Sequence, residues 1–183
     1  MTGRTIETTL DDLQAWVEAA IAPELEYLVP PDDGRVDDFE AVTGNPTVYQ
    51  SFVPGKERLH EGDMQAPAIA VQLVSGSNRA SSRRTLSVRL MLVIWSPGHF
   101  DADGYHRDND GWRDLYNGLD AMVTAIEEAE VIAGCTVDHN RGIQYGYLDI
   151  DGEIPDLYPY WIGRVDFDLL GATPGSKRFN EYL

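Results

Sequence analysis

The sequence has a single cysteine, almost no lysine and no long hydrophobic run. Cys135 stands alone among 183 residues, which excludes an internal disulfide and a zinc site built from several cysteines. We expect its side chain to be buried as a small apolar group. The longest apolar stretch, 90–95, is too short to cross a bilayer, and no basic segment followed by an apolar run marks a secretory signal. The length predicts one domain whose core needs no cross-links.

Positive charge is scarce as well. Thirty-one Asp and Glu oppose fourteen Lys and Arg, which gives a net charge of −17, and Lys56 and Lys177 are the only lysines. A surface this acidic repels nucleic acid, so we expect no binding through phosphate contacts. At molar salt, screening shortens the range of charge repulsion to a few ångströms, and hydrated carboxylates keep a protein soluble. The composition resembles that of proteins from salt-loving archaea and their viruses; the alternative is an ordinary acidic protein.

The spacing of apolar residues predicts two helices. Apolar side chains recur every three or four residues after Thr8 and Thr9, either of which would cap an N-terminal helix. A second apolar stripe predicts a central helix over about 111–133, which Gly134 would end. The order of helix, long loop, hairpin, helix and strands indicates an α+β fold, in which both helices pack against an antiparallel sheet.

Strands are predicted where runs of β-branched and aromatic residues lie between turn-forming residues. These segments are 67–74 and 84–95, which form a long hairpin, followed by strands within 135–139, 143–151 and 158–171. Alternation of apolar and polar residues is lost at 91–95, so we expect this end of the strand to be covered on both faces.

Two further segments extend the predicted domain, which covers 1–183. The segment 30–65 is rich in proline, glycine and acidic pairs, with one short strand expected at 47–53. An excursion of this length is usually functional or bound to a partner. The polar tail 172–183 ends in aromatic and apolar residues, which suits an arm that docks on a neighbouring molecule.

The stretch 99–112 carries four aspartates and two histidines and is the first candidate for a metal site. An EF-hand loop requires glycine at its sixth position and glutamate at its twelfth, and registers starting at Asp101 or Asp108 provide neither. The four histidines show no ligand spacing such as HExxH, and the acidic stretch 149–156 also fits a turn. We therefore expect a solvated loop in which Asp108 or Asp110 caps the central helix, and no catalytic, cofactor or metal residues. An irregular cation site is the alternative.

Arg79, Arg83 and Arg84 place a quarter of the arginines within six residues, at the tip of the long hairpin. Such a cluster is either a solvated turn or a basic prong that contacts the acidic face of a neighbour. Arginine suits the second role because its planar fork pairs with a carboxylate at two points. A ring of identical subunits requires a contact of this kind, in which one patch meets a different patch on the next copy.

The order of elements resembles that of tail terminator (tail completion) proteins of long-tailed viruses. The similarity rests on the helix "LDDLQAWVEAAI", the strands "PAIAVQLV" and "RTLSVRLMLVIW", the helix "DLYNGLDAMVTAIEEA" and the closing strand "YPYWIGRVDFDLLG". It covers most of the chain but is one of order and texture, without a diagnostic motif, and the insertion 30–65 departs from compact members. Together with the acidic composition, it indicates a virus of a halophilic archaeon.

The resemblance implies a structural protein without cofactor or catalysis, located in the virion after assembly in the host cytoplasm. Members form a ring, usually of six subunits, that ends polymerisation of the tail tube protein and joins the tail to a neck or connector protein while DNA passes through. Arg79, Arg83 and Arg84 become candidate contacts with the next subunit or the tube. Asp166 and Asp168, predicted to face outward, become candidates for a negative channel wall. The alternatives are another neck, head-completion or tail tube component and, more distantly, a small metal-dependent enzyme.

Overall fold

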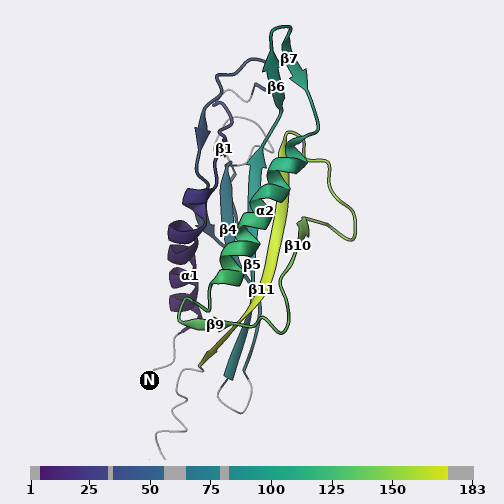
Figure 1. Ribbon diagram of the computed structural model, residues 1–183. Helices are drawn as coiled ribbons and strands as arrows, with labels where there is room; N and C mark the ends of the chain where they lie inside the picture. The colour runs from purple at the N-terminus through teal and green to yellow at the C-terminus, as the bar shows by residue number, and fades with distance from the viewer. Residues whose placement is uncertain (1–4, 33–34, 56–64, 79–82, 173–183) are drawn as a thin grey trace, which may run out of the picture.

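The computed structural model describes residues 5–32, 35–55, 65–78 and 83–172, and it confirms the predicted α+β fold. Its elements are α1 (Ile6–Ala20), the short 3₁₀ helix η1 (Ala22–Glu24), β1 (Tyr27–Leu28), β2 (Thr43–Gly44), β3 (Thr47–Gln50), β4 (Ala68–Asn78), β5 (Arg83–Trp95), β6 (Gly98–Asp101), β7 (Gly104–Arg107), α2 (Gly111–Glu128), β8 (Val131–Ile132), β9 (Cys135–Val137), β10 (Gln144–Tyr147) and β11 (Tyr160–Ala172). Both helices lie over one face of a long sheet, and the β6–β7 hairpin projects from one end (Figure 1). No helix of the described residues is long and apolar enough to cross a membrane.

A seven-stranded sheet of order β3-β4-β5-β11-β9-β8 forms the frame, with β10 pairing to β11 beside β9. The two central strands, β5 and β11, pair along their full length, from Tyr160↔Trp95 to Ala172↔Arg83. The sheet is antiparallel except at its edge, where β3 runs parallel to β4. The predicted antiparallel sheet is therefore confirmed, with β3 added as an edge strand whose parallel direction the sequence did not indicate. The connection 51–67 is long enough to carry the chain back to the end from which β3 started, which a parallel pair requires.

The main core lies between the sheet and the two helices. Alternate side chains of the long strands meet the apolar stripes of α1 and α2, as the periodicity predicted. The fully buried members include Leu13, Val17, Ile69, Leu86, Leu90, Leu92, Leu115, Leu119, Met122, Val165 and Leu169. Cys135 is also buried in this core, at 5% exposure, as expected for a lone cysteine. Burial at about 25 cal/mol per Å² of apolar surface makes this layer the dominant stabilising contribution.

A second, smaller cluster covers the opposite face of the sheet at the end of β5. Val93 and Trp95 are buried there, so this end of the strand is covered on both faces, as predicted from the loss of alternation. Phe39 packs edge-on against Trp95 with ring centroids 4.8 Å apart. Part of the 30–65 excursion therefore completes the core, whereas 33–34 and 56–64 lie outside the described residues.

Two predicted helix boundaries are wrong. Thr5 caps α1, because its side chain accepts the amide of Thr8, whereas Thr9 bonds back to the carbonyl of Thr5 inside the helix. Helix α2 ends at Glu128 instead of continuing to Gly134. Ala133 and Gly134 have φ angles of 52° and 70° and form the two-residue turn between β8 and β9. Positive φ at both turn positions gives the twist that joins antiparallel strands, so Gly134 serves a hairpin and not a helix end.

Candidate functional site

The stretch 99–110 forms a hairpin and not a simple loop. Strands β6 and β7 pair with His99 opposite His106, and their rings stack with centroids 5.6 Å apart. His99 Nδ1 lies 2.6 Å from a carboxylate oxygen of Asp108, and this hydrogen bond lowers the pKa of the carboxyl. Among the described residues, no three His, Cys, Asp or Glu side chains gather as a metal site would require. The hairpin therefore fixes the position of the segment that leads into α2.

The start of α2 lies where it was predicted, but its capping differs. Asp110 occupies the capping position with helical backbone angles, and its side chain makes no capping hydrogen bond. Instead, Asp108 accepts the amide of Asp110 at 3.1 Å and orders the turn before the helix, while Asp110 contacts Arg113 at 3.5 Å. The prediction that an aspartate caps orphan amides of the helix is therefore wrong for Asp110. Two acidic groups still lie near the positive end of the helix dipole.

The three hairpin arginines have different outcomes. Arg79 lies outside the described residues, and of Arg83 the structure describes only the backbone, at the first position of β5. Arg84 is 8% exposed, and its Nε donates to the side-chain oxygen of Asn78 at 3.3 Å. The guanidinium of Arg84 is thus held within its own chain, and the predicted contact with a neighbour stays a prediction for this cluster.

Asp166 and Asp168 face away from the helices, as the alternation along β11 predicted. Arg89 reaches Asp166 at two points, 2.6 and 3.0 Å, and these hydrogen bonds raise the pKa of the arginine. Arg164 contacts Asp166 at 2.5 Å and also Asp149 at 3.2 Å. Arg141 lies 2.6 Å from Asp168, whose side chain is 10% exposed. This face of the sheet therefore presents paired charges, which reduces the negative field that a channel wall of free carboxylates would have.

The C-terminal end of β4 forms an open sheet edge. Its pairing with β3 stops at Val71, and beyond that residue no strand of the described chain pairs with the outer edge. From Val74 to Asn78 the side chains are exposed, and a bulge at Val74 shifts the register with β5. Here the long strands extend past the layer of helices (Figure 1). Unpaired amides and carbonyls at such an edge can pair with a strand of another molecule.

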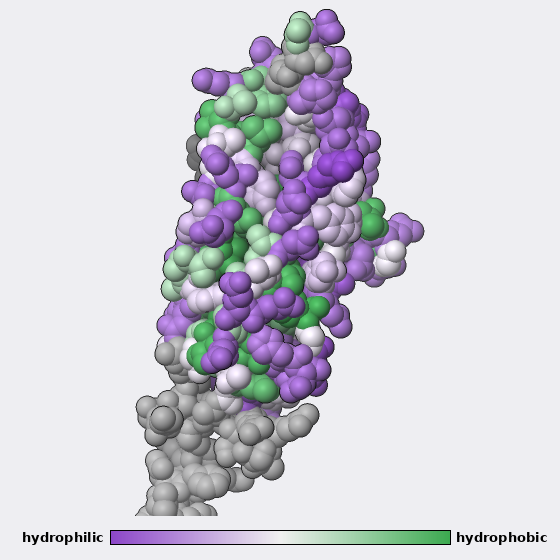
Figure 2. All heavy atoms as spheres, viewed as in Figure 1, coloured by the Kyte–Doolittle hydropathy of each residue, from purple (hydrophilic) through white to green (hydrophobic). Residues whose placement is uncertain are grey.

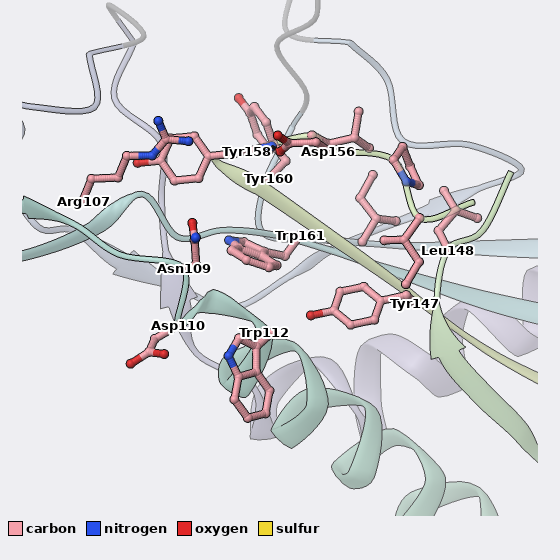
Figure 3. Close-up of a pocket in the computed structure, with 14 residues that line it drawn as sticks. Arg107, Asn109, Asp110, Trp112, Tyr147, Leu148, Asp156, Tyr158, Tyr160 and Trp161 are labelled. Carbon is pink, nitrogen blue, oxygen red and sulfur yellow. Dashed lines mark hydrogen bonds between the residues drawn. The ribbon is translucent and has the colours of Figure 1, made fainter. Parts of the chain in front are cut away.

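An aromatic pocket of about 600 Å³ lies where the start of α2, the end of β10 and the start of β11 meet. Trp112, Tyr147 and Trp161 surround one hollow, and Asp156 lies on the other side of the Trp161 ring from Trp112 (Figure 3). Trp161 is held by a hydrogen bond from Nε1 to the carbonyl of Ser96, at 3.1 Å. Its ring leaves no room for a side chain at Gly111, where a Cβ would lie 2.3 Å from that nitrogen. We call this site the aromatic pocket.

One wall of the aromatic pocket is made rigid by polar contacts. The guanidinium of Arg107 stacks over the ring of Tyr158 at 3.8 Å from its centroid. The hydroxyl of Tyr158 hydrogen-bonds to that of Tyr105 at 2.8 Å and to the carbonyl of Pro97. Burial and the hydrogen bond to Tyr105 raise the pKa of Tyr158, so the phenol stays neutral and keeps the proton that it donates to Pro97. The pocket is therefore preformed on this side.

Sequence reasoning missed the aromatic pocket. Helical spacing places Trp112 in the apolar stripe of the central helix, yet this residue is 39% exposed. Strand alternation places Trp161 on the inward face of the closing strand and does not show that this ring lines a hollow. The one available signal is the density of tyrosine, tryptophan and aliphatic residues from 145 to 162 beside the acidic stretch 149–156. No protein-family model matches the chain, and a search of curated proteins finds no similar sequence.

Proposed function

We propose that the chain is a ring-forming structural subunit, a tail terminator at the head-proximal end of a viral tail tube. In this role it ends polymerisation of the tube protein and joins the tail to a neck protein, in a virion assembled in the host cytoplasm. The ring has six copies, and the acidic composition suits a halophilic archaeal host. Its work is done by shape and contact, without a cofactor.

The observation that carries the proposal is the open edge of β4 beyond the helices. An edge of exposed residues, Val74 to Asn78, offers backbone groups that no other strand of the described residues pairs with and that a strand of another chain would satisfy. The same extension includes the ends of β5 and β11, so it is stiff enough to hold a neighbour at a fixed angle. Heterologous contacts of this kind generate closed rings when the rotation between copies divides a full turn.

The polar face of the sheet is the candidate for the channel side. Asp166 and Asp168 stay proposed channel residues, now with Arg89, Arg164 and Arg141 as their partners. A face of paired charges attracts DNA less than free arginines would and repels it less than free carboxylates would. Weak interaction of either sign allows a polyanion to slide past.

Negative-stain electron microscopy of the purified chain in molar KCl, with and without tail tubes, tests the proposal. Closed single rings that bind one end of a tube are expected. A Val74→Lys variant, which places a charge on the open edge, should lose the rings, whereas Thr124→Lys on the exposed side of α2 should keep them. If the chain alone forms open-ended tubes, it is a tube subunit instead. A monomer that does not bind tubes would refute the ring.

A further inference from the structure

The surface around the aromatic pocket is unusually apolar for so acidic a chain. Of the ten large apolar side chains that are exposed in the described residues, three line this site, and two more belong to β10 and to the loop that leads from it to the pocket. These five are Trp112, Tyr145, Ile150, Ile154 and Leu157. Apolar side chains show on the loop that projects beside α2 (Figure 2). Clustered exposure of this kind marks a contact with another molecule, whereas single exposed residues need no explanation.

We propose that the aromatic pocket binds the segment Lys177–Arg178–Phe179 of a second copy of this chain. The segment belongs to 173–183, which lies outside the described residues. Lys177 and Arg178 form an adjacent basic pair in a chain of net charge −17, and Phe179 follows them directly. The benzyl ring would fill the hollow between Trp112, Tyr147 and Trp161, because offset and edge-on ring pairs are favoured over contact with water.

Charge complementarity supports the same occupant. The loop that borders the aromatic pocket contains Asp151, Glu153 and Asp156, all exposed. Asp156 is part of the pocket lining and accepts the amide of Tyr158 at 3.2 Å, which holds its carboxylate on the rim. A basic pair next to a phenylalanine meets both features at once, the acidic rim and the aromatic hollow. Aromatic and arginine side chains of this type dominate the binding energy of protein interfaces.

The length of the chain favours docking between two molecules over docking within one. Strand β11 runs from Tyr160, at the aromatic pocket, to Ala172 at the opposite end of the sheet (Figure 1). At about 3.3 Å per residue, the eleven steps from Trp161 to Ala172 span roughly 36 Å. Phe179 follows Ala172 by seven residues, and a fully extended chain of that length reaches at most about 25 Å. Even fully extended, the segment barely reaches the near edge of its own pocket, at Tyr147 opposite Gly163, so docking into the pocket of a neighbour is favoured.

The contact joins two different surfaces of two copies. Its role as a contact between ring subunits rests on the proposed function. It supplies a head-to-tail contact between subunits, separate from the open edge of β4. Because the two contacts use different residues, each can be tested while the other is intact.

Fluorescence titration with a synthetic peptide of residues 173–183 tests the binding. The receptor is the full chain with Arg178→Glu and Phe179→Ala, so that no intact tail competes. Saturable binding is expected, weakened at least about tenfold by Phe179→Ala in the peptide or by Trp112→Ala in the receptor. Phe52→Ala, which removes an aromatic ring of 67% exposure after β3, should leave binding unchanged. Equal binding to the Trp112→Ala and Phe52→Ala receptors would overturn the proposal, as would the absence of binding.

Mixing two full-length variants tests whether the contact joins two molecules. One variant carries Trp112→Ala and an intact tail, and the other carries Arg178→Glu with Phe179→Ala and an intact pocket. Both variants also carry Val74→Lys, which removes the proposed contact through the β4 edge. By sedimentation velocity, each alone should then be a monomer, and the mixture should form one-to-one pairs. Peptide binding without pair formation would overturn docking between copies. If rings form but the peptide does not bind, this inference is refuted and the ring proposal is unaffected. If the peptide binds but no rings form, the ring proposal is refuted and binding of the segment to the aromatic pocket is unaffected.

Discussion

At the level of single residues, Asp166 holds two arginines on the open face of the sheet. Its carboxylate receives two hydrogen bonds from Arg89 and contacts Arg164, and its side chain is 22% exposed. Asp166→Ala would leave two guanidinium groups side by side without their shared partner. We expect a loss of about 2 kcal/mol in the free energy of unfolding, between the values typical of surface and buried pairs. Urea denaturation in molar KCl measures this difference.

The matched control is Asp120→Ala on the exposed surface of α2, which removes the same charge. It should change the free energy of unfolding by less than about 0.5 kcal/mol. Similar values for the two variants would mean that net charge, and not the arginine network, determines the effect of Asp166.

At the level of elements, α2 approaches the sheet closely only because Gly118 has no side chain. A Cβ at this position would lie 2.0 Å from the hydroxyl of Tyr27 and 2.7 Å from a methyl carbon of Leu92. Burial and the nearby Asp114 raise the pKa of Tyr27 to about 12, so this hydroxyl stays protonated in the contact. Alanine normally stabilises a helix interior relative to glycine by roughly 1 kcal/mol. Overpacking costs about 1–3 kcal/mol and should reverse that sign.

Thermal unfolding of Gly118→Ala therefore should show a lower Tm than the unsubstituted chain. Thr124→Ala, on the exposed side of the same helix, has only the propensity effect and should raise Tm slightly. If Gly118→Ala raised Tm as well, the helix would have room to move away from Leu92.

Elements with strong periodicity were predictable, and those set by tertiary contacts were not. The inward positions of β5, the face of Asp166 and the start of α2 follow from alternation and helical spacing alone. The end of α2 was misplaced because Gly134 is a turn residue in a hairpin whose strands are only two and three residues long. The aromatic pocket was unpredictable because its walls come from three segments, each of which has a valid core or turn interpretation by itself. The partners of Asp166 depend on strand register, which one sequence does not give.

At the level of the whole molecule, the net charge of −17 makes stability depend on salt. Self-repulsion among carboxylates opposes the compact state, and raising ionic strength from about 0.1 M to about 2 M shortens the screening length from about 10 Å to below 3 Å. If this screening removes about 3 kcal/mol of charge repulsion, Tm should rise by about 10 °C for a chain of this size.

A variant with Glu18→Gln, Asp120→Asn and Glu127→Gln, three exposed helix positions, should show a smaller rise of Tm with salt. Scanning calorimetry across KCl concentrations measures both slopes. A Tm that stays constant or falls with KCl would refute halophilic adaptation and the proposed host. The ring and the aromatic pocket are tested by the separate experiments described above.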